Sequence, residues 1–335
     1  MSAIARQPGI AFGVFLEPTW GVAVQCPRCG GFFEGIAQSG ATSVCRLRCS
    51  GCFFLLQTEN GIWKTLPPDR EIYFQGFMKE YQIVRATEGR GSQLSEYYLE
   101  LPYRDLSGRN ESQWAIRART FRYIKDRLLP RMETAHPAGL KILDLGAGNG
   151  WLSYRLVLRG HQPVAVDLLT NDQDGLGAAD HFREHLPVLF PRFQAELDRL
   201  PFADSQFDLA IFNASLHYSE DYEQTLREAI RCLHARGKVI IADTAWYHHE
   251  ESGQQMLAER RQAYISQYGF ASDNIRSLEY LTDERLHTLE RRLGLHWQLH
   301  LPFYGLRWAM RPCMAKLQAR REPSKFRVYV AEIRK

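Results

Sequence analysis

The amino-acid sequence predicts an α/β protein in which an open, mostly parallel sheet follows a small β-rich unit near the N-terminus. Two observations carry this prediction. Five of the seven cysteines lie between Cys26 and Cys52, and residues 141–159 read as a buried strand, a glycine-rich loop and a helix. Because 335 residues exceed one typical domain, we expect two folded units.

The composition is ordinary for a soluble globular protein, with 45% hydrophobic and 24% charged residues. Residues 1–20 lack a basic leader followed by an apolar run, and no apolar stretch is long enough to span a membrane. We therefore expect a cytoplasmic protein. The net charge of +4 is uneven, since residues 307–335 contain nine Lys or Arg and two Glu. This basic end either faces phosphate or carboxylate groups or is a solvated surface.

The N-terminal cysteines form two C-x2-C pairs, Cys26 with Cys29 and Cys49 with Cys52, separated by 19 residues. Two turns of this kind present four thiolates to one tetrahedral Zn²⁺. No ligand position is left open for water, which favours structural over catalytic zinc. Stable disulfides do not fit a chain without a secretory leader. Cys45 is left as an alternative ligand or a bystander.

Short strands are expected around these turns, at residues 22–25, 44–48 and 53–57, so residues 1–66 are predicted to form a zinc ribbon. Gly30, Gly31 and Gly51 are expected to supply positive φ angles so that the backbone wraps the metal.

The two prolines at positions 67 and 68 end the ribbon. Residues 67–110 are read as a connector, and residues 111–335 as the larger domain. The apolar spacing at 114–129 predicts an amphipathic helix that ends at Pro130 and leads into this domain. Aromatic residues of this region, Trp114 among them, either line a substrate entrance or pack against the neighbouring domain.

The loop after the strand at 141–145 has glycines at 146, 148 and 150, and a helix from 151 to 159 follows it. A strand, a glycine-rich loop and a helix in this order are typical of a nucleotide site in a Rossmann-like sheet. The dinucleotide fingerprint needs glycine at position 151, where Trp151 stands, and no G-x4-G-K-[ST] loop is present. The pattern disfavours a nicotinamide or a nucleoside triphosphate ligand.

The run I-L-D-L-G-A-G-N-G at 142–150 resembles the first motif of class I S-adenosylmethionine-dependent methyltransferases, especially the type 11 group that resembles ubiquinone and menaquinone methylases. Residues 195–209, with L-P-F, an acidic residue and F-D-L, resemble the third and fourth motifs. The resemblance implies a seven-stranded Rossmann-like sheet. In this reading a helix at 221–235 and strands at 238–244, 296–301 and 327–333 complete the fold, and residues 249–290 form a variable lid.

The resemblance also implies that S-adenosylmethionine is the cofactor. Gly146 and Gly148 would let the backbone approach its methionyl part, and Asp144 would accept from its ammonium group. Asp167 would accept from the ribose hydroxyls, and Glu196 from the adenine amino group. The full set of implied cofactor-binding residues is Asp144, Gly146, Ala147, Gly148, Gly150, Asp167, Leu168, Glu196, Leu197 and Asn213.

Methyl transfer needs alignment of acceptor and methyl group more than it needs a catalytic triad. His217, which follows the strand at 207–213, is the best candidate for a general base if the acceptor is a hydroxyl. The alternative is that His217 only packs beside the cofactor.

Three functions follow from these patterns. The first is methyl transfer to a small-molecule or lipid acceptor. The second is RNA methylation, in which the ribbon and the basic end contact RNA, although the ribbon holds few basic residues. The third is a scaffold protein that keeps the cofactor fold without catalysis, against which the intact loop and Asp167 argue. Neither the acceptor atom nor the oligomeric state follows from the sequence.

Overall fold

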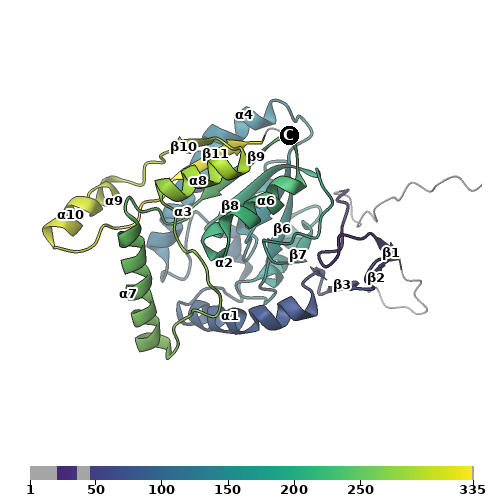
Figure 1. The fold of residues 1–335 in the computed structure, drawn as a ribbon, viewed down its shortest axis with the longest axis horizontal. Coiled ribbons are helices and arrows are strands. Elements are labelled where there is room, and N and C mark those ends of the chain that lie inside the picture. Colours follow the sequence, from purple (N-terminus) through teal and green to yellow (C-terminus); the bar gives the residue numbers. More distant parts are fainter. Residues whose placement is uncertain (1–20, 36–45, 334–335) are drawn as a thin grey trace, which may run out of the picture.

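A computed structural model describes residues 21–35 and 46–333 (Figure 1). Within these ranges a single sheet has the strand order β1-β2-β3-β4-β7-β6-β5-β8-β9-β11-β10. The strands are β1 (Phe33–Gly35), β2 (Arg46–Cys49), β3 (Leu55–Glu59), β4 (Ile62–Lys64), β5 (Lys141–Leu145), β6 (Gln162–Asp167), β7 (Arg192–Gln194), β8 (Phe207–Asn213), β9 (Leu233–Ala242), β10 (Trp297–His300) and β11 (Val328–Glu332).

The centre of the sheet is parallel and buried. Strand β5 pairs with β6 on one side and with β8 on the other, and β9 and β7 continue the parallel order outward. Strands β11 and β10 close this edge in antiparallel orientation. Seven strands from β7 to β10 therefore form the Rossmann-like sheet that the sequence predicts. Their order reverses at β5, and the crevice outside the carboxyl ends of strands at such a point is where α/β proteins bind ligands.

The N-terminal strands continue this sheet. Strands β1 to β4 are antiparallel to one another, and β4 runs parallel to β7, with Trp63 opposite Phe193. The rings of these two residues stack with centroids 6.3 Å apart. Residues 44 and 45 of one predicted strand lie outside the described residues.

The helices cover both faces of the sheet (Figure 1). The α-helices are α1 (Pro68–Thr87), α2 (Ser95–Glu100), α3 (Glu111–Tyr123), α4 (Leu129–Glu133), α5 (Trp151–Val157), α6 (Tyr222–Cys232), α7 (Glu250–Tyr268), α8 (Asp283–Leu293), α9 (Leu306–Ala309) and α10 (Arg311–Leu317). Short 3₁₀ segments lie at Leu176–His185 and Leu216–Tyr218. In the described ranges, no helix combines the length and apolar character needed to cross a membrane.

The predicted helix at 114–129 does not end at Pro130. Helix α3 passes into one π-helical turn, Ile124–Leu128, and α4 then carries Pro130 in its first turn. The Leu129 N–H bonds to the Ile124 carbonyl, five residues back. Because the wider turn changes the hydrogen-bonding register, the chain accommodates a proline that lacks an N–H, and the helical path continues.

Helix α1 lies in the segment read from sequence as a connector. Pro68 stands at its start, where a missing N–H is tolerated, and Asp69 and Glu71 lie in its first turn, where acidic groups favour a helix. Phe74 and Phe77 are buried against the larger domain. This 20-residue helix runs along one side of the molecule in Figure 1.

The later elements follow the sequence expectation with shifted bounds. Asp221 caps α6 by accepting from the N–H groups of Glu223 and Gln224. The helix ends at Cys232 rather than near 235, because Leu233 already pairs with Phe207 and starts β9. The two last predicted strands correspond to β10 and β11.

Candidate functional site

A cavity opens at the carboxyl ends of β5, β6 and β8, at the point where the strand order reverses. It encloses about 890 Å³ with its open mouth included, a size suited to a small-molecule ligand. Eight of the ten cofactor-binding positions implied by the sequence line it: Asp144, Gly146, Ala147, Gly148, Asp167, Leu168, Leu197 and Asn213. Gly150 and Glu196 are not among its lining residues.

The glycine loop is shaped by close contacts. Gly146 has φ +75°, and a Cβ at this position would lie 2.2 Å from the Cβ of Ser215. The N–H groups of Gly146 and Ala147 both donate to the Val166 carbonyl, which ties the loop to β6. Gly150, which directly precedes α5, is needed for other reasons. Its φ is +79°, and a Cβ at this position would lie 2.8 Å from the Phe190 ring. Gly150 therefore serves packing behind the loop.

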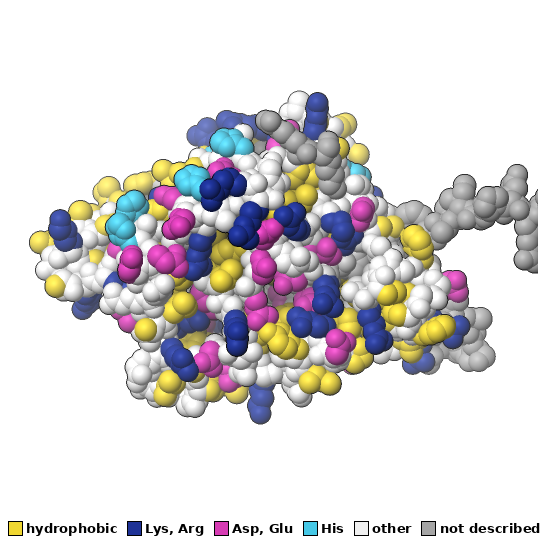
Figure 2. All heavy atoms as spheres, viewed as in Figure 1, with side chains coloured by type: hydrophobic (Ala, Val, Ile, Leu, Met, Phe, Trp, Pro, Cys, Tyr) yellow, Lys and Arg dark blue, Asp and Glu magenta, His cyan; other side chains and the backbone are white. Residues whose placement is uncertain are grey.

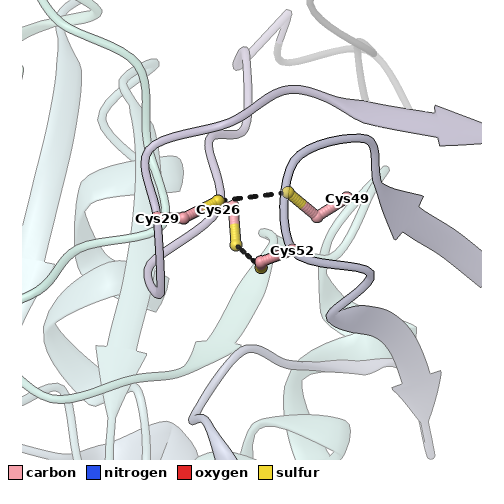
Figure 3. A group of neighbouring side chains, drawn as sticks. All are labelled: Cys26, Cys29, Cys49 and Cys52. Carbon is pink, nitrogen blue, oxygen red and sulfur yellow. Dashed lines mark hydrogen bonds between the residues drawn. The ribbon is translucent and has the colours of Figure 1, made fainter.

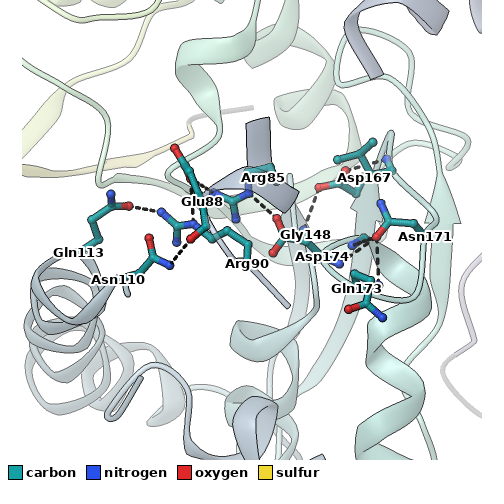
Figure 4. Close-up of polar contacts among 12 residues, drawn as sticks. Arg85, Glu88, Arg90, Asn110, Gln113, Gly148, Asp167, Asn171, Gln173 and Asp174 are labelled. Carbon is teal, nitrogen blue, oxygen red and sulfur yellow. Dashed lines mark hydrogen bonds and ion pairs between the residues drawn. The ribbon is translucent and has the colours of Figure 1, made fainter. Parts of the chain in front are cut away.

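Asp167 stands at the end of β6 and accepts two backbone hydrogen bonds, from Gly148 and Leu169, each 2.8 Å long (Figure 4). Burial raises the pKa of the Asp167 carboxyl to about 6, although these two N–H groups act in the opposite direction. Each carboxylate oxygen keeps a second lone pair that can accept from a ligand hydroxyl.

Asp144 and Asn213 add polar atoms to the cavity. The Ser153 hydroxyl donates to Asp144 over 2.7 Å, and burial raises the pKa of Asp144 to about 7, with a further contribution from the negative charge of Asp167. Asn213 ends β8, and its Oδ1 is buried without a hydrogen-bond partner. A buried acceptor of this kind favours a ligand donor at the same place.

The Glu196 carboxylate forms an ion pair within the protein. Arg70 of α1 donates to both of its carboxylate oxygens, with a shortest contact of 2.6 Å, and the Glu196 side chain is only 4% exposed. The carboxylate lies in a smaller cleft beside the main cavity, with Phe77 and Leu197 among its lining residues. Sequence reasoning gave Glu196 a cofactor contact and did not foresee the ion pair.

His217 is not among the residues that line the main cavity. Its Nδ1 is buried without a hydrogen-bond partner. Burial lowers the pKa of His217 to about 4, and the positive charges of Arg260 and Arg117 lower it further, whereas Glu279 acts against them. The imidazole is therefore neutral near pH 7, in the form that can accept a proton, but it is a weak base.

Helices α1 and α3 bring residues to the cavity that sequence reasoning did not assign to the cofactor. Tyr81 and Arg85 come from α1, and Arg85 forms an ion pair with Asp174 (Figure 4). Trp114 and Arg117 come from α3. Burial and the positive charges of Arg90 and Arg85 lower the pKa of Arg117, which has no ion-pair partner among the described residues. An unpaired cation in a cavity favours an anionic ligand.

The four predicted zinc ligands converge at one point (Figure 3). The Sγ atoms of Cys26, Cys29, Cys49 and Cys52 all lie within 4.8 Å of one another. Cys29 and Cys49 are 3.4 Å apart at sulfur, and Cys26 and Cys52 are 3.6 Å apart. Cys45 lies outside the described residues.

The glycines beside the cysteines act differently from the prediction. Gly30 has φ +73°, as expected, but Gly31 and Gly51 do not adopt positive φ. Gly31 is instead required for space, because a Cβ there would lie 2.9 Å from the Cys49 Sγ, and a Cβ on Gly51 would make a tight contact of 3.3 Å with the Cys29 Sγ. Their N–H groups donate to the Sγ atoms of Cys29 and Cys49.

Comparison with known families identifies the segment around the cavity. Residues 143–241 match the family described as "Methyltransferase domain". The resemblance to class I S-adenosylmethionine-dependent methyltransferases that the sequence motifs predict is thereby confirmed for this segment.

Individual relatives match a part of the chain. A malonyl-[acyl-carrier protein] O-methyltransferase of Halorhodospira halophila is 34% identical over 125 residues, which are 36% of this chain and 40% of the relative. A demethylmenaquinone methyltransferase of Mycobacterium marinum is 31% identical over 105 residues, 31% of this chain and 42% of the relative. The chain thus spans less than half of the length of either relative.

Among solved structures, a 1,6-didemethyltoxoflavin-N1-methyltransferase of Burkholderia thailandensis can be superposed on this chain with a TM-score of 0.46 and 14% identity. The superposition covers 90% of this chain and 100% of the other.

Proposed function

We propose, starting from the methyltransferase domain at residues 143–241, that the whole chain transfers a methyl group from S-adenosylmethionine to a small-molecule or lipid-linked acceptor. The observation that carries the proposal is the convergence of Asp144, Asp167 and the unpartnered Oδ1 of Asn213 around the glycine loop, in one cavity at the strand-order reversal. These groups match a ligand that has an ammonium group, ribose hydroxyls and a flat ring.

The residues of the site fit this cofactor. Asp144 and Asp167 offer carboxylate oxygens for the ammonium and ribose groups, and Gly146 and Gly148 of the loop line the cavity where the methionyl part would lie. Leu168 and Leu197 offer apolar contact to the adenine ring. When bound, S-adenosylmethionine supplies a methyl group on a positively charged sulfur, which an acceptor atom displaces in line. The chain then has to align the acceptor and exclude water.

Aromatic side chains contribute much of the cavity lining. They are Phe77, Tyr81, Trp114 and Tyr218. This lining suits an acceptor with an apolar body, which agrees with the coarse class of acceptor that we propose. His217 is the candidate for proton removal only if an acceptor hydroxyl reaches its buried Nδ1, and its lowered pKa makes it a weak base for that step.

The other functions weighed from sequence are not favoured. The names of the relatives include a malonyl-[acyl-carrier protein] and a demethylmenaquinone acceptor rather than RNA. A scaffold without catalysis gives no reason for unpaired polar groups in the cavity.

We also propose that Cys26, Cys29, Cys49 and Cys52 bind one structural Zn²⁺. Zinc–sulfur bonds of about 2.3 Å in a tetrahedron separate the sulfurs by about 3.8 Å. Two sulfur pairs of the cluster lie 3.4 and 3.6 Å apart, and all four sulfurs lie within 4.8 Å of one another. The ion would hold together two turns that lie in a segment too small to build a core of its own.

Calorimetric titration with S-adenosylmethionine tests the proposed function directly. Wild-type protein should bind, and Asp167→Ala should lose most of the affinity. Asp172→Ala is the matched control, because Asp172 is an exposed acid outside the cavity lining. Transfer of a labelled methyl group to a panel of acyl thioesters, quinols and phenols then tests catalysis. Absence of cofactor binding by folded wild-type protein would reject the function.

A further inference from the structure

Residues 301–321 form an arm that extends from the larger domain and ends in α9 and α10 (Figure 1). Met310 joins the two helices with right-handed helical backbone angles, and its N–H bonds to the Leu306 carbonyl. The N–H of Met314 bonds in turn to the Met310 carbonyl. The arm therefore presents one continuous helical surface from Leu306 to Leu317.

One face of this helix is anchored to the protein. The Tyr304 hydroxyl lies 2.9 Å from the Thr120 hydroxyl of α3, and Trp308 stacks on Phe326. At the end of the arm, Arg321 forms an ion pair with Glu259 of α7. These contacts hold the arm beside α7 and leave an open groove between them, which Met310 and Met314 line together with Glu259.

The helix also carries an exposed apolar stripe made of Leu306, Met310, Met314 and Leu317. Their spacing of three or four residues places them on one side of the helix. All four are exposed, Leu306 by 74% and Leu317 by 83%, and the exposed Phe303 precedes them. Hydrophobic and basic side chains gather at the tip of the arm in Figure 2. A row of large exposed apolar side chains marks a contact surface.

Positive charge lies beside the stripe. Between Leu301 and Arg321 there are five Lys or Arg and no acidic residue. Arg307, Lys316 and Arg320 are exposed, and Arg307 and Arg320 line the same groove as Met310 and Met314. A helix with an apolar face and basic residues beside it is suited to lie in the interface of a bilayer that contains anionic lipids.

We propose that the stripe and the basic residues beside it dock the protein on an anionic lipid surface. A second copy of the arm would meet the same row of cations, so charge repulsion opposes pairing of two stripes. A nucleic acid has phosphates that could contact the basic residues, but it offers no apolar surface to the stripe. A bilayer offers both, with acyl chains for the stripe and headgroup charge for Arg307, Lys316 and Arg320.

Co-sedimentation with vesicles tests the proposal without cofactor, so its outcome is independent of methyl transfer. Wild-type protein should bind vesicles of equal phosphatidylglycerol and phosphatidylcholine at least about tenfold more tightly than vesicles of phosphatidylcholine alone. High salt should weaken the binding. Equal binding to the two vesicle types, or no binding to either, would overturn the proposal.

Variants separate the stripe from general surface effects. Leu306→Glu with Leu317→Glu should reduce binding to the anionic vesicles by about tenfold or more, because each change removes an apolar contact and adds a repelled charge. Ile72→Glu on α1 is the matched control, since Ile72 is also 74% exposed and lies outside the arm. The molar mass of each variant is measured by light scattering. A wild-type dimer that the stripe variant converts to a monomer would instead identify the stripe as an interface between copies, and undiminished vesicle binding by that variant would also reject the proposal.

Discussion

Ser215 fills the space in which Gly146 would carry a side chain, with its Cβ only 2.2 Å from the position of an added Cβ. The Ser215 hydroxyl donates over 2.5 Å to the Leu145 carbonyl, the last residue of β5. The segment after β8 therefore presses against the loop after β5, and the cavity lies where both meet. Glycine at 146 is required by this contact as well as by its positive φ.

We expect Gly146→Ala to lose most affinity for S-adenosylmethionine and to destabilise the fold. The new Cβ has to displace Ser215 or the loop, and either movement changes the shape of the cavity. Overpacking of this kind costs about 1–3 kcal/mol in addition to the backbone strain. Calorimetry and thermal denaturation measure the two effects.

Gly160→Ala is the matched control. Gly160 has φ +88° but an added Cβ meets nothing within 4 Å. This variant should lose about 1 kcal/mol of stability from backbone strain and keep the wild-type affinity. Similar affinities of the Gly146 and Gly160 variants would contradict the role assigned to the Ser215 contact.

Cofactor affinity should depend on pH through Asp144 and Asp167. Their pKa values are raised to about 7 and about 6 because both carboxyls are buried. Each has to be ionised to accept from the ammonium or ribose groups, so binding is weakened by protonation. We expect affinity to rise as pH increases from about 5 to about 8, by up to about tenfold per pH unit for each group that titrates.

The same titration checks the assignment to a residue. In Asp144→Asn the part of the pH dependence that lies nearest pH 7 should disappear, and the overall affinity should fall. Proton release on binding, measured by calorimetry in buffers of different ionisation enthalpy, should decrease in parallel. An affinity that falls with rising pH between 5 and 8 would disprove the assignment.

The ion pair between Arg70 and Glu196 is expected to stabilise the attachment of α1. Both carboxylate oxygens of a nearly buried Glu196 accept from Arg70. Glu196→Ala should lower the free energy of unfolding by about 1–3 kcal/mol, because it leaves a partly buried guanidinium unpaired. A double-mutant cycle with Arg70→Ala measures the coupling. Glu196→Ala should lower the cofactor affinity less than Asp167→Ala does. A larger loss of affinity in Glu196→Ala would show that contact with the adenine ring is the main role of Glu196.

Metal removal should unfold the ribbon first. A strong chelator is expected to release one zinc per chain and to lower the melting temperature, because the metal–sulfur bonds that join the two turns are lost. Cys49→Ser should reproduce this effect. Cys313→Ser is the control, since Cys313 is an exposed cysteine of α10 far along the chain from the cluster. Full stability of zinc-free protein would exclude a structural role for the metal.

The features predicted correctly from sequence are those whose cause is local in the chain. The glycine loop follows its strand directly, and the two cysteines of each pair lie within four residues of the sequence, so the clustering of the four thiols could be predicted. Helix α1 was not predicted from the sequence, because its apolar residues are not confined to one face of the helix. Ile72 and Ile83 are exposed although Phe77 is buried, since one side of the helix covers the cavity and the other meets solvent.

The site residues missed from sequence depend on contacts between distant segments. Arg70 meets Glu196 across 126 residues, and Arg85 meets Asp174 across 89. No pattern of neighbouring residues in the sequence indicates either ion pair. The prediction that the helix ends at Pro130 was wrong for a related reason. A π-helical turn before Pro130 accommodates the backbone hydrogen bond that proline cannot donate, and the residue types in the sequence do not indicate this turn.

Arg117 is expected to bind the methionine carboxylate of the cofactor. It lines the cavity without an ion-pair partner among the described residues, and its neighbour Trp114 packs edge-on against Trp151, at the start of the helix that follows the glycine loop. The guanidinium therefore lies on the side of the cavity where the methionyl part would meet the loop. Loss of a charged hydrogen bond costs about 1.5–3 kcal/mol, so Arg117→Met should bind S-adenosylmethionine about tenfold to a hundredfold more weakly.

Decarboxylated S-adenosylmethionine separates this role from a role toward the acceptor. Wild-type protein should bind the decarboxylated analogue more weakly than the cofactor, and Arg117→Met should bind both about equally. Arg117→Lys keeps the charge but not the planar pair of donors, so its affinity should lie between the two. If Arg117→Met binds the cofactor as tightly as wild type while the Michaelis constant for an anionic acceptor rises, the unpaired guanidinium serves the acceptor, and the assignment to the cofactor carboxylate is wrong.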